Sequence, residues 1–366
     1  MSSKKDKSNN LDKYFMSIAM NLAKERIGLT GLNPPVGCVI VKNNKILSFG
    51  QTGFRGRPHA ETVAINKCKK NELRGSSIYI TMEPCTHYGK TPPCTNQIVK
   101  SKIKRVIYSC NDIDKRTSNK AYSLLRSKKI NVSKGLLKSE SKKFYKNYFN
   151  HKKNKKPYIA AKIACSSDFF ISSKNKFITN QHSRDVSHIL RYNFDSILIS
   201  SKTANADNSK LSCRINGLEN FSPKRLIIDK NLKINKKSPV ITDKNKNNTI
   251  IFHSTKDKKK LRYFKLRGIR LSYTDLDSNN NIDLKKVFLK AYSFGIGSII
   301  IEGGKTLTKS ILKDKLINEF YLFKSKNKLG NLGNNKFSDF KKKIIFFKKK
   351  ENIETFLDGD KIIRYY

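Results

Sequence analysis

The sequence is poor in acidic residues, has no tryptophan and contains no long apolar run. It holds 28 Asp and Glu against 77 Lys and Arg in 366 residues, a formal net charge of +49. No apolar stretch reaches the roughly 18–20 residues of a membrane-spanning helix, and the first twelve residues lack the apolar core of a secretory signal. Seven cysteines, an odd number, do not suggest a disulfide framework, so we expect a reducing, cytoplasmic location.

The excess of positive charge has two interpretations. Lys and Arg neutralise phosphates, which would indicate a nucleic-acid-binding protein. The lysine runs, however, lie in separate loops and tails, for example at 255–260, 341–343 and 348–350, and Lys, Asn, Ile and Ser are abundant everywhere, as in proteins from AT-rich genomes. We therefore favour compositional bias, and expect no specific nucleic-acid partner, no membrane partner and only weak non-specific binding of polyanions.

The hydrophobic pattern predicts two α/β domains. In the first part, expected strands alternate with expected helices, which favours an α/β sandwich. The strands are expected at 36–41, 45–49, 77–82, 105–109 and 130–132, and the helices at 11–28, 59–70, 95–100 and 121–127. The charged segment 144–156 is interpreted as a solvated linker, so the domains are placed at 1–150 and 151–366.

After residue 157 the alternation starts again and predicts a second sheet. Its strands are expected at 158–164, 196–200, 225–229, 249–253, 269–273 and 298–302. Its helices are expected at 183–192, 284–294 and 307–313.

Two short strings carry the strongest chemical signal. His59-Ala-Glu61 stands where a helix is expected to begin, and Cys85 and Cys94 bracket a loop after an apolar strand. A catalytic zinc needs three protein ligands and an open position for water. His59, Cys85 and Cys94 supply three ligands and leave Glu61 free to move protons, which is the arrangement of zinc-dependent base deaminases. Zinc lowers the pKa of bound water to about 7 and so provides hydroxide near neutral pH.

A closed, structural zinc site is the alternative. It would need a fourth ligand, for which Cys38, Cys68 and His87 are candidates, but none has the spacing of a zinc ribbon. It would also leave Glu61 without a role. Two competing hypotheses follow: a basic nucleic-acid-binding protein with a structural zinc, and a deaminase acting on tRNA or single-stranded nucleic acid.

Glu83-Pro-Cys-Thr-His-Tyr-Gly-Lys-Thr-Pro-Pro-Cys94 and Asn33-Pro-Pro-Val-Gly37 resemble the bifunctional deaminase–reductase family of riboflavin biosynthesis. Eight residues separate the cysteines, as in that family, whereas nucleic-acid deaminases have two. The resemblance covers almost the whole chain, most strongly 11–135, and implies a cytidine-deaminase-like α/β/α sandwich in which Asn33, His87 and Lys90 bind substrate. From the residues alone, His87 is equally a loop-packing residue and Lys90 a surface charge. Thr52 stands where the family usually has a histidine.

The second half resembles the reductase domain of the same family, whose fold is similar to dihydrofolate reductase. Asp168-Phe169 replaces the family's Asp-Gly, and the loop before Phe177 is shortened to Lys174-Asn175-Lys176. The resemblance implies that NADPH is contacted by Ala164, Phe177, Thr203, Asp207, Gly304, Lys305, Thr306, Leu307, Thr308, Lys309 and Ser310. It implies that the ribosyl substrate and its phosphate are held by Lys162, Arg191, Leu211, Arg214 and Glu302. From the residues alone, Arg191 is equally a solvated helix residue, and Thr203 and Asp207 are equally turn formers.

The function implied by the resemblance has two steps. Deamination of 2,5-diamino-6-(5-phosphoribosylamino)pyrimidin-4(3H)-one would be followed by NADPH reduction of the ribosyl group, giving 5-amino-6-(5-phosphoribitylamino)uracil. One zinc per chain, NADPH and a homo-oligomer are expected. Gly303-Gly304, between an apolar strand and a helix, also fits a phosphate site. The altered loops leave open an active deaminase beside a reductase domain that has lost its activity.

Overall fold

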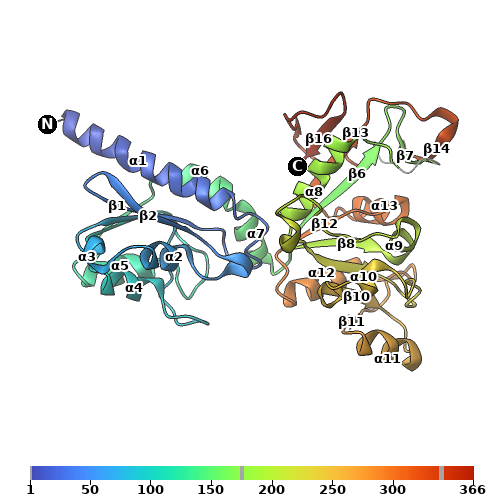
Figure 1. Cartoon of the computed structure of the whole chain (residues 1–366), viewed down its shortest axis with the longest axis horizontal. Helices are drawn as coiled ribbons and strands as arrows, with labels where there is room; N and C mark the ends of the chain where they lie inside the picture. Colours follow the sequence, from blue (N-terminus) through green and yellow to red (C-terminus); the bar gives the residue numbers. More distant parts are fainter. Residues whose placement is uncertain (1, 174–176, 338–341) are drawn as a thin grey trace. The chain divides into compact units, whose positions relative to one another are not determined.

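The computed structural model describes residues 2–173, 177–337 and 342–366, with side chains from residue 9 onward. The chain forms two compact units, Met1–Lys155 and Lys156–Tyr366 (Figure 1), so the division falls at Lys155, whereas we placed it at residue 150. Three of the residues in the shortened loop, 174–176, lie outside the described part of the chain, as do 338–341. None of the described helices has both the length and the apolar character that a bilayer crossing requires.

The first unit is a five-stranded sheet of order β2-β1-β3-β4-β5. β1 pairs antiparallel with β2 and β3, whereas β3, β4 and β5 are parallel. The strands are β1 (Gly37–Lys42), β2 (Lys45–Gln51), β3 (Ser77–Met82), β4 (Arg105–Cys110) and β5 (Asn131–Lys134). The helices are α1 (Ser2–Lys24), α2 (Ala60–Asn66), α3 (Lys70–Leu73), α4 (Cys94–Lys100), α5 (Lys120–Ser127), α6 (Lys138–Phe144) and α7 (Lys146–Asn154).

Alternating side chains of these strands build two cores, one on each face of the sheet. Val39 and Tyr79 pack with Phe15 and Met16 of α1. On the opposite face, Ile40, Ile78, Val106 and Tyr108 pack with residues of α2, α4 and α5. Figure 1 shows α1 on one side of the sheet and these helices on the other. The strand period of two therefore produces the α/β/α sandwich that the sequence predicts.

The segment interpreted as a solvated linker is instead part of the first unit. Residues 146–154 form α7, in which Tyr148 and His151 are buried. Tyr145, Tyr148 and Phe149 stand at helical spacing and pack against the α2–α5 core, while Lys146 and Asn147 between them are exposed. The run of charges concealed this apolar stripe, and the linker prediction was wrong for that reason.

The second unit is built on a nine-stranded sheet of order β11-β10-β9-β8-β12-β6-β13-β16-β15, in which only β16 runs opposite to the rest and pairs antiparallel with both β13 and β15. Its strands are β6 (Tyr158–Cys165), β8 (Ser196–Ser200), β9 (Lys224–Ile228), β10 (Thr249–His253), β11 (Arg270–Tyr273), β12 (Ser298–Ile301), β13 (Glu319–Lys324), β15 (Lys350–Asn352) and β16 (Lys361–Tyr365). A separate ribbon pairs β7 (Phe170–Ser173) with β14 (Gly333–Lys336). The helices are α8 (Gln181–Tyr192), α9 (Ser201–Asp207), α10 (Pro239–Thr242), α11 (Lys258–Leu266), α12 (Leu284–Ser293) and α13 (Lys305–Lys313).

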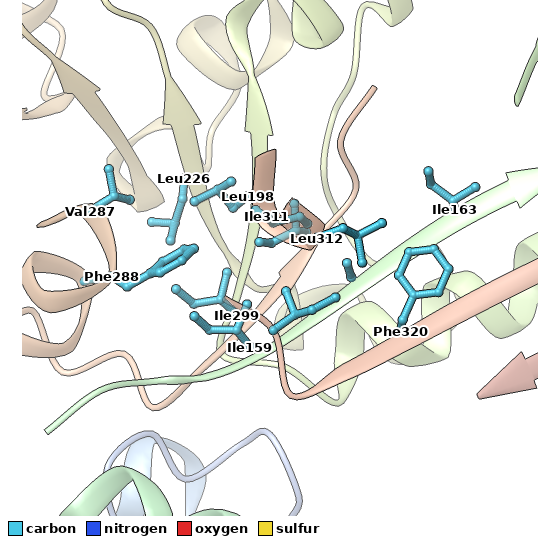
Figure 2. Packing of buried hydrophobic residues seen from close by; sticks show 14 of the residues in the cluster. Ile159, Ile163, Leu198, Leu226, Val287, Phe288, Ile299, Ile311, Leu312 and Phe320 are labelled. Carbon is cyan, nitrogen blue, oxygen red and sulfur yellow. The ribbon is translucent and has the colours of Figure 1, made fainter. Parts of the chain in front are cut away.

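Both faces of this sheet are covered, which explains the continuous apolar runs of its strands. In β12, Ile299 and Ile301 point into a core with α12 and α13, whereas Ile300 points into the core on the other face. Figure 2 shows the first core, where Phe288 of α12 and Ile311 of α13 meet the strands. The strands predicted between 158 and 302 agree with the structure to within one residue at each end.

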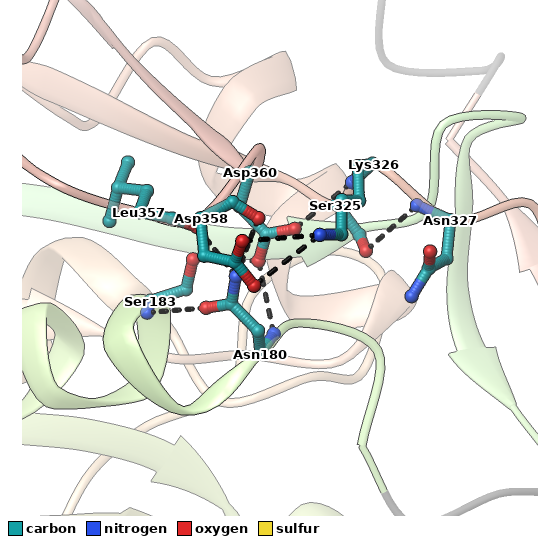
Figure 3. A network of polar contacts seen from close by, with 8 residues as sticks. All are labelled: Asn180, Ser183, Ser325, Lys326, Asn327, Leu357, Asp358 and Asp360. Atoms are coloured by element: carbon teal, nitrogen blue, oxygen red, sulfur yellow. Dashed lines mark hydrogen bonds and ion pairs between the residues drawn. The ribbon is translucent and has the colours of Figure 1, made fainter.

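The side chains of Asn180 and Asp360 fix the start of α8. At its start, the Asn180 side chain accepts from the Ser183 N–H and donates to the Leu357 carbonyl (Figure 3). The Asp360 carboxylate accepts from the Ser183 hydroxyl at 2.7 Å and from the N–H groups of Asn180 and Lys326, both at 3.0 Å. The segment before β16 therefore anchors the helix that carries Arg191.

Gly37 at the start of β1 leaves no room for a side chain. A Cβ on this residue would lie 1.9 Å from the Ala19 carbonyl oxygen in α1. We expect Gly37→Ala to lower the free energy of unfolding of the first unit by about 3 kcal/mol, because the backbone of α1 must move. Cys38→Ala, at the next and fully buried position, removes one sulfur and should cost only about 1 kcal/mol. Urea unfolding followed by circular dichroism measures both, and equal losses would contradict the packing argument.

Candidate active sites

Three side chains in the first unit form a cluster with the composition of a catalytic zinc site. His59 immediately precedes α2, Cys85 follows β3, and Cys94 is the first residue of α4. Their ligand atoms all lie within 4.8 Å of one another. The His59 Nδ1 atom is 3.3 Å from the Cys94 sulfur and 3.6 Å from the Cys85 sulfur. Tetrahedral zinc with ordinary bond lengths separates a nitrogen from a sulfur ligand by about 3.6 Å, so these residues fit zinc.

Hydrogen bonds already favour a thiolate at one of the two cysteines. The Cys94 thiol, together with His59 and the Cys94 backbone N–H at 3.2 Å, lowers the pKa of Cys85 to about 4. The hydrogen bond to Cys85, with burial, raises the pKa of Cys94. His59 and Cys85 are only partly buried, whereas Cys94 is buried. The site is thus prepared for a cation and open on one side.

Glu61 lies next to the cluster without belonging to it. It stands in the first turn of α2 and is only 4% exposed. Burial raises its pKa, and the neighbouring His59 opposes that rise. A carboxyl group beside a three-ligand site, outside the ligand set, is placed for proton transfer.

The residues considered as a fourth ligand are engaged elsewhere in the described part of the chain. Cys38 lies in β1 within the core, and the Cys68 thiol donates to the Ser48 hydroxyl at 3.0 Å. His87 Nδ1 is 3.0 Å from the Thr117 hydroxyl. The cluster found among the described residues contains three ligands and no fourth, which favours the catalytic interpretation over the closed one.

The residues predicted to bind the deaminase substrate lie in the loops around the cluster. Asn33 is partly buried, and its amide points at the Gly56 carbonyl at 3.5 Å, three residues before His59. Lys90 is exposed, in the loop between the two cysteines. Arg57, which the sequence analysis missed, donates to the Thr91 hydroxyl of that loop at 2.5 Å. Its signal was its position two residues before His59.

The lysines are less evenly spread than the sequence suggested. A concavity of about 1410 Å³ in the first unit is lined by Lys115, Lys134, Lys138, Lys142, Lys146, Lys152, Lys153 and Lys155, together with Asp112 and Asp114. One wall adjoins the metal loop, because the Thr86 hydroxyl donates to the Arg116 carbonyl. Asp114 is paired with Arg116 at 2.6 Å and with Lys152 at 3.7 Å. If the protein binds polyanions weakly, as the composition predicts, this surface is where we expect that binding.

In the second unit, charged side chains from within β6, from the end of β12 and from the last turn of α8 converge. Arg191 of α8 donates two hydrogen bonds of 2.8 Å to Glu302, which directly follows β12. Burial would raise the pKa of Glu302, but Arg191 and, more weakly, Lys162 of β6 outweigh it and lower the pKa to about 2. Burial lowers the pKa of Lys162. Of the five residues predicted to hold the ribosyl substrate, these three are brought together.

Two further groups border this cluster. Burial and the charge of Arg191 lower the pKa of Arg214, and the charge of Glu302 only partly opposes this. Burial and the charge of Glu302 raise the pKa of Asp207. His188, one turn before Arg191, was missed by the sequence analysis. It is buried, and burial together with Arg191 lowers its pKa to about 4, so it is neutral at pH 7. Its signal was the i, i+3 spacing to Arg191 on one helix.

The residues predicted to contact NADPH are distributed over three elements. Thr203, in the first turn of α9, lies near Gly304, because a Cβ on Gly304 would be 3.5 Å from its hydroxyl. Gly304 precedes α13, which contains Lys305, Thr306, Leu307, Thr308, Lys309 and Ser310. Thr308 is buried and donates to the Gly303 carbonyl, whereas Lys309 is exposed. The start of α13 therefore faces α9 across the glycine pair.

The remaining predicted residues differ in exposure. Ala164 of β6 is partly buried, and Leu211 is only 3% exposed within the core, so its side chain is a packing group. Phe177 is 55% exposed, with the Arg184 guanidinium 4.3 Å from its ring centre. Leu211 also has a φ of +54°, so its backbone forms a tight turn before Arg214.

Phe169 adopts the turn for which the resembling family uses glycine. Its φ is +67°, in the left-handed region, and its N–H donates to the Ser166 carbonyl at 3.0 Å. Asp168 accepts from the Ser166 hydroxyl and from the N–H groups of Leu329 and Gly330. These bonds hold a bulky residue in a conformation that costs about 1–2 kcal/mol, so the loop after β6 is preserved despite the substitution.

The fold and the two sites define a zinc-type base deaminase joined to a reductase. Residues 9–110 match the cytidine and deoxycytidylate deaminase zinc-binding region, and residues 157–343 match the RibD C-terminal domain. The riboflavin biosynthesis protein RibD of Aquifex aeolicus is 32% identical over 316 residues, 86% of each chain. That of Buchnera aphidicola is 33% identical over 341 residues, 87% of this chain and 88% of the other.

Solved structures agree along the full length. RibD of Acinetobacter baumannii superposes with a TM-score of 0.82 at 24% identity, covering 98% of this chain and 99% of the other, which supports the fold. A deaminase/reductase from Thermotoga maritima superposes with a TM-score of 0.80 at 27% identity and the same coverage. The chain belongs to the RibD family, the bifunctional deaminase–reductases of riboflavin biosynthesis.

The Arg191–Glu302 ion pair should contribute to the free energy of unfolding of the second unit. Each side chain is about 15% exposed (14% and 15%), so Glu302→Gln leaves a largely buried guanidinium without its partner and should cost about 3 kcal/mol at pH 7. Because the pKa of Glu302 is lowered from 4.5 to about 2, its contribution is complete above pH 4.5 and is lost as the pH falls towards 2.

The difference in unfolding free energy between wild type and Glu302→Gln should therefore narrow between about pH 4.5 and pH 2. Urea unfolding followed by circular dichroism measures that difference. Glu354→Gln, at an exposed position, is the control and should change little at any pH. A difference that stays constant over this range would show that the Glu302 charge does not stabilise the unit.

Proposed function

We propose that the first unit deaminates 2,5-diamino-6-(5-phosphoribosylamino)pyrimidin-4(3H)-one and that the second unit reduces the ribosyl group of the product to ribityl. The product would be 5-amino-6-(5-phosphoribitylamino)uracil. The observation that carries the proposal is the three-ligand cluster with buried Glu61 beside it. The Thermotoga maritima protein with the same fold is described as a diaminohydroxyphosphoribosylaminopyrimidine deaminase and 5-amino-6-(5-phosphoribosylamino)uracil reductase.

In the deaminase, His59, Cys85 and Cys94 would hold one zinc per chain, which supplies activation of water near neutral pH when bound. Glu61 accepts the proton of the attacking water and returns it to the leaving amine. It is suited to this because it lies in the first turn of α2 beside His59 yet outside the ligand set. Asn33, His87 and Lys90 orient the pyrimidine from the surrounding loops.

Arg57 adds a positive charge to the same rim. Its guanidinium contacts Thr91 in the loop between the two cysteines, next to Gly89. A guanidinium forms two parallel hydrogen bonds to a phosphate, so we assign Arg57 to the ribose phosphate of the substrate. Lys90 is exposed in the same loop and would share that role.

In the reductase, NADPH would supply the hydride. Its phosphates are assigned to the glycine pair and the start of α13, where backbone N–H groups are accessible. Ala164, Phe177, Thr203 and Asp207 would complete that site. Lys162, Arg191 and Arg214 bring three positive charges towards the substrate phosphate, and Glu302 fixes the orientation of Arg191 through its two bonds. Leu211 would contribute through its backbone turn.

The proposal also covers the binding partner, the cellular location and the oligomeric state. The partner is a small phosphorylated pyrimidine, without a specific nucleic acid or a membrane partner. None of the seven cysteines, all within the described residues, forms a disulfide, which fits the reducing cytoplasm in which we place the protein. A homo-oligomer remains our expectation from the family resemblance.

Glu61→Gln tests the assignment of the proton carrier. The amide is nearly isosteric but accepts no proton, so the rate of ammonia release should fall by about 10²- to 10⁴-fold. Zinc content, measured by atomic emission on the purified protein, should stay at one per chain, because Glu61 is not a ligand. Glu140→Gln, at an exposed position, should leave the rate unchanged. Loss of zinc from Glu61→Gln would instead indicate a ligand role.

A coupled assay on zinc-loaded protein tests the two steps together. With the diaminopyrimidinone phosphate and NADPH present, ammonia release should precede NADPH oxidation. Ammonia without NADPH loss, even when the deaminated intermediate is supplied, would mean that the second unit has lost its activity. If zinc-loaded protein gave neither ammonia nor NADPH oxidation, the substrate assignment would be contradicted, and RNA would then be tested as a substrate.

A further inference from the structure

The loop that carries Asn33 contains two consecutive prolines and is held by side-chain hydroxyl groups. Pro34 and Pro35 have no N–H to offer, so the loop cannot pair as a strand would. Three successive carbonyls nevertheless each accept an O–H group. The Thr30 hydroxyl donates to the Asn33 carbonyl at 2.7 Å, the Thr52 hydroxyl to the Pro34 carbonyl at 3.1 Å, and the Tyr145 hydroxyl to the Pro35 carbonyl at 3.0 Å.

Two hydroxyl groups, one of them that of Thr52, also accept hydrogen bonds from the N–H groups that follow the prolines. The Val36 N–H donates to the Thr52 hydroxyl at 2.9 Å, and the Gly37 N–H donates to the Thr81 hydroxyl at 3.0 Å. Thr81 and Tyr145 are 2.6 Å apart. Because the single Tyr145 proton goes to the Pro35 carbonyl, the Thr81 hydroxyl must be the donor to Tyr145. Hydrogen bonds therefore run in one direction, from the Gly37 N–H to Thr81, from Thr81 to Tyr145 and from Tyr145 to the Pro35 carbonyl.

These hydroxyl groups are buried and come from distant parts of the first unit. Thr52 follows β2 and is 2% exposed, Thr81 lies in β3 and is fully buried, and Tyr145 stands between α6 and α7 and is 1% exposed. Burial raises the pKa of Tyr145 well above its ordinary value, so the phenol keeps the proton that it donates. A carbonyl that loses its donor here loses a partly buried hydrogen bond, and the loop is then free to shift.

We propose that Thr52 and Tyr145 are positioning residues of the deaminase: through the Pro34 and Pro35 carbonyls they hold Asn33 where it contacts the base. The inference rests on the proposed function, because it takes Asn33 as a substrate-binding residue. Each hydroxyl gives its single proton to the loop and is itself buried, so its effect passes through the loop. They set the affinity for the pyrimidine and leave the proton transfer by Glu61 untouched.

The test uses variants that remove only a hydroxyl group. Tyr145→Phe and Thr52→Val should each raise the KM for the pyrimidine about tenfold, the effect of losing one partly buried hydrogen bond to the loop, with little change in kcat. Thr52→Ser, which keeps the hydroxyl, should restore KM. Tyr148→Phe is the matched control, because that buried hydroxyl on α7 donates to Asp112 and not to the loop, and it should leave KM unchanged.

A double-mutant cycle separates positioning from general destabilisation. In an Asn33→Ala background, Tyr145→Phe should have almost no further effect on KM, because the contact that it positions is already gone. A tenfold loss that persists in this background, or an equal loss in Tyr148→Phe, would overturn the proposal. So would a KM unchanged in both Tyr145→Phe and Thr52→Val.

Hydrogen exchange gives a readout that does not depend on the substrate. Thr52→Val removes the acceptor of the Val36 N–H, so amide exchange in segment 30–40 should become faster than in wild type and in Tyr148→Phe. Unchanged exchange would show that Thr52 does not hold the loop. If wild type releases no ammonia from the pyrimidine, the proposed function fails, and exchange still decides whether the hydroxyl groups fix the loop.

Discussion

The deaminase site depends on the packing of α2 and α4 against one face of the first sheet. His59 and Cys94 are thirty-five residues apart in the sequence, and each stands at the beginning of one of these helices. Ala60 and Ala64 of α2 and Ile98 of α4 are buried in the same core, and the Thr62 hydroxyl donates to the Gln97 side chain at 2.8 Å between the helices. Small residues in α2 allow the close approach, and the histidine and the thiols meet as a result.

The metal ligands could be predicted from the sequence because each lies in a short string whose residue types have few other uses. The strands were predictable for a similar reason, since apolar runs such as Ile299-Ile300-Ile301 are compatible with a sheet covered on both faces. What sequence reasoning missed depends on contacts between distant residues. Tyr145 is 110 residues from the Pro35 carbonyl that it binds, and no local pattern relates them.

Charge was the most misleading local signal. Lysines surround the aromatic stripe of α7 and hid a helix there, and the same bias obscured β13, whose residues 319–324 are almost all buried. Both segments keep their apolar positions, and the lysines occupy the solvated ones. The positive charge therefore lies mainly on the surface of this chain while its cores are apolar, which explains how a charge of +49 is compatible with two ordinary α/β units.

The position of His59 and Cys94 at helix starts has a consequence for folding. Zinc held by these two residues and Cys85 would join the ends of two helices and a strand that are otherwise connected through core packing and a few hydrogen bonds. A cation that binds the folded arrangement and not the extended chain shifts the folding equilibrium towards the native state. The supply of zinc would then govern how much of the newly made chain reaches its native form, as well as how fast the finished enzyme turns over.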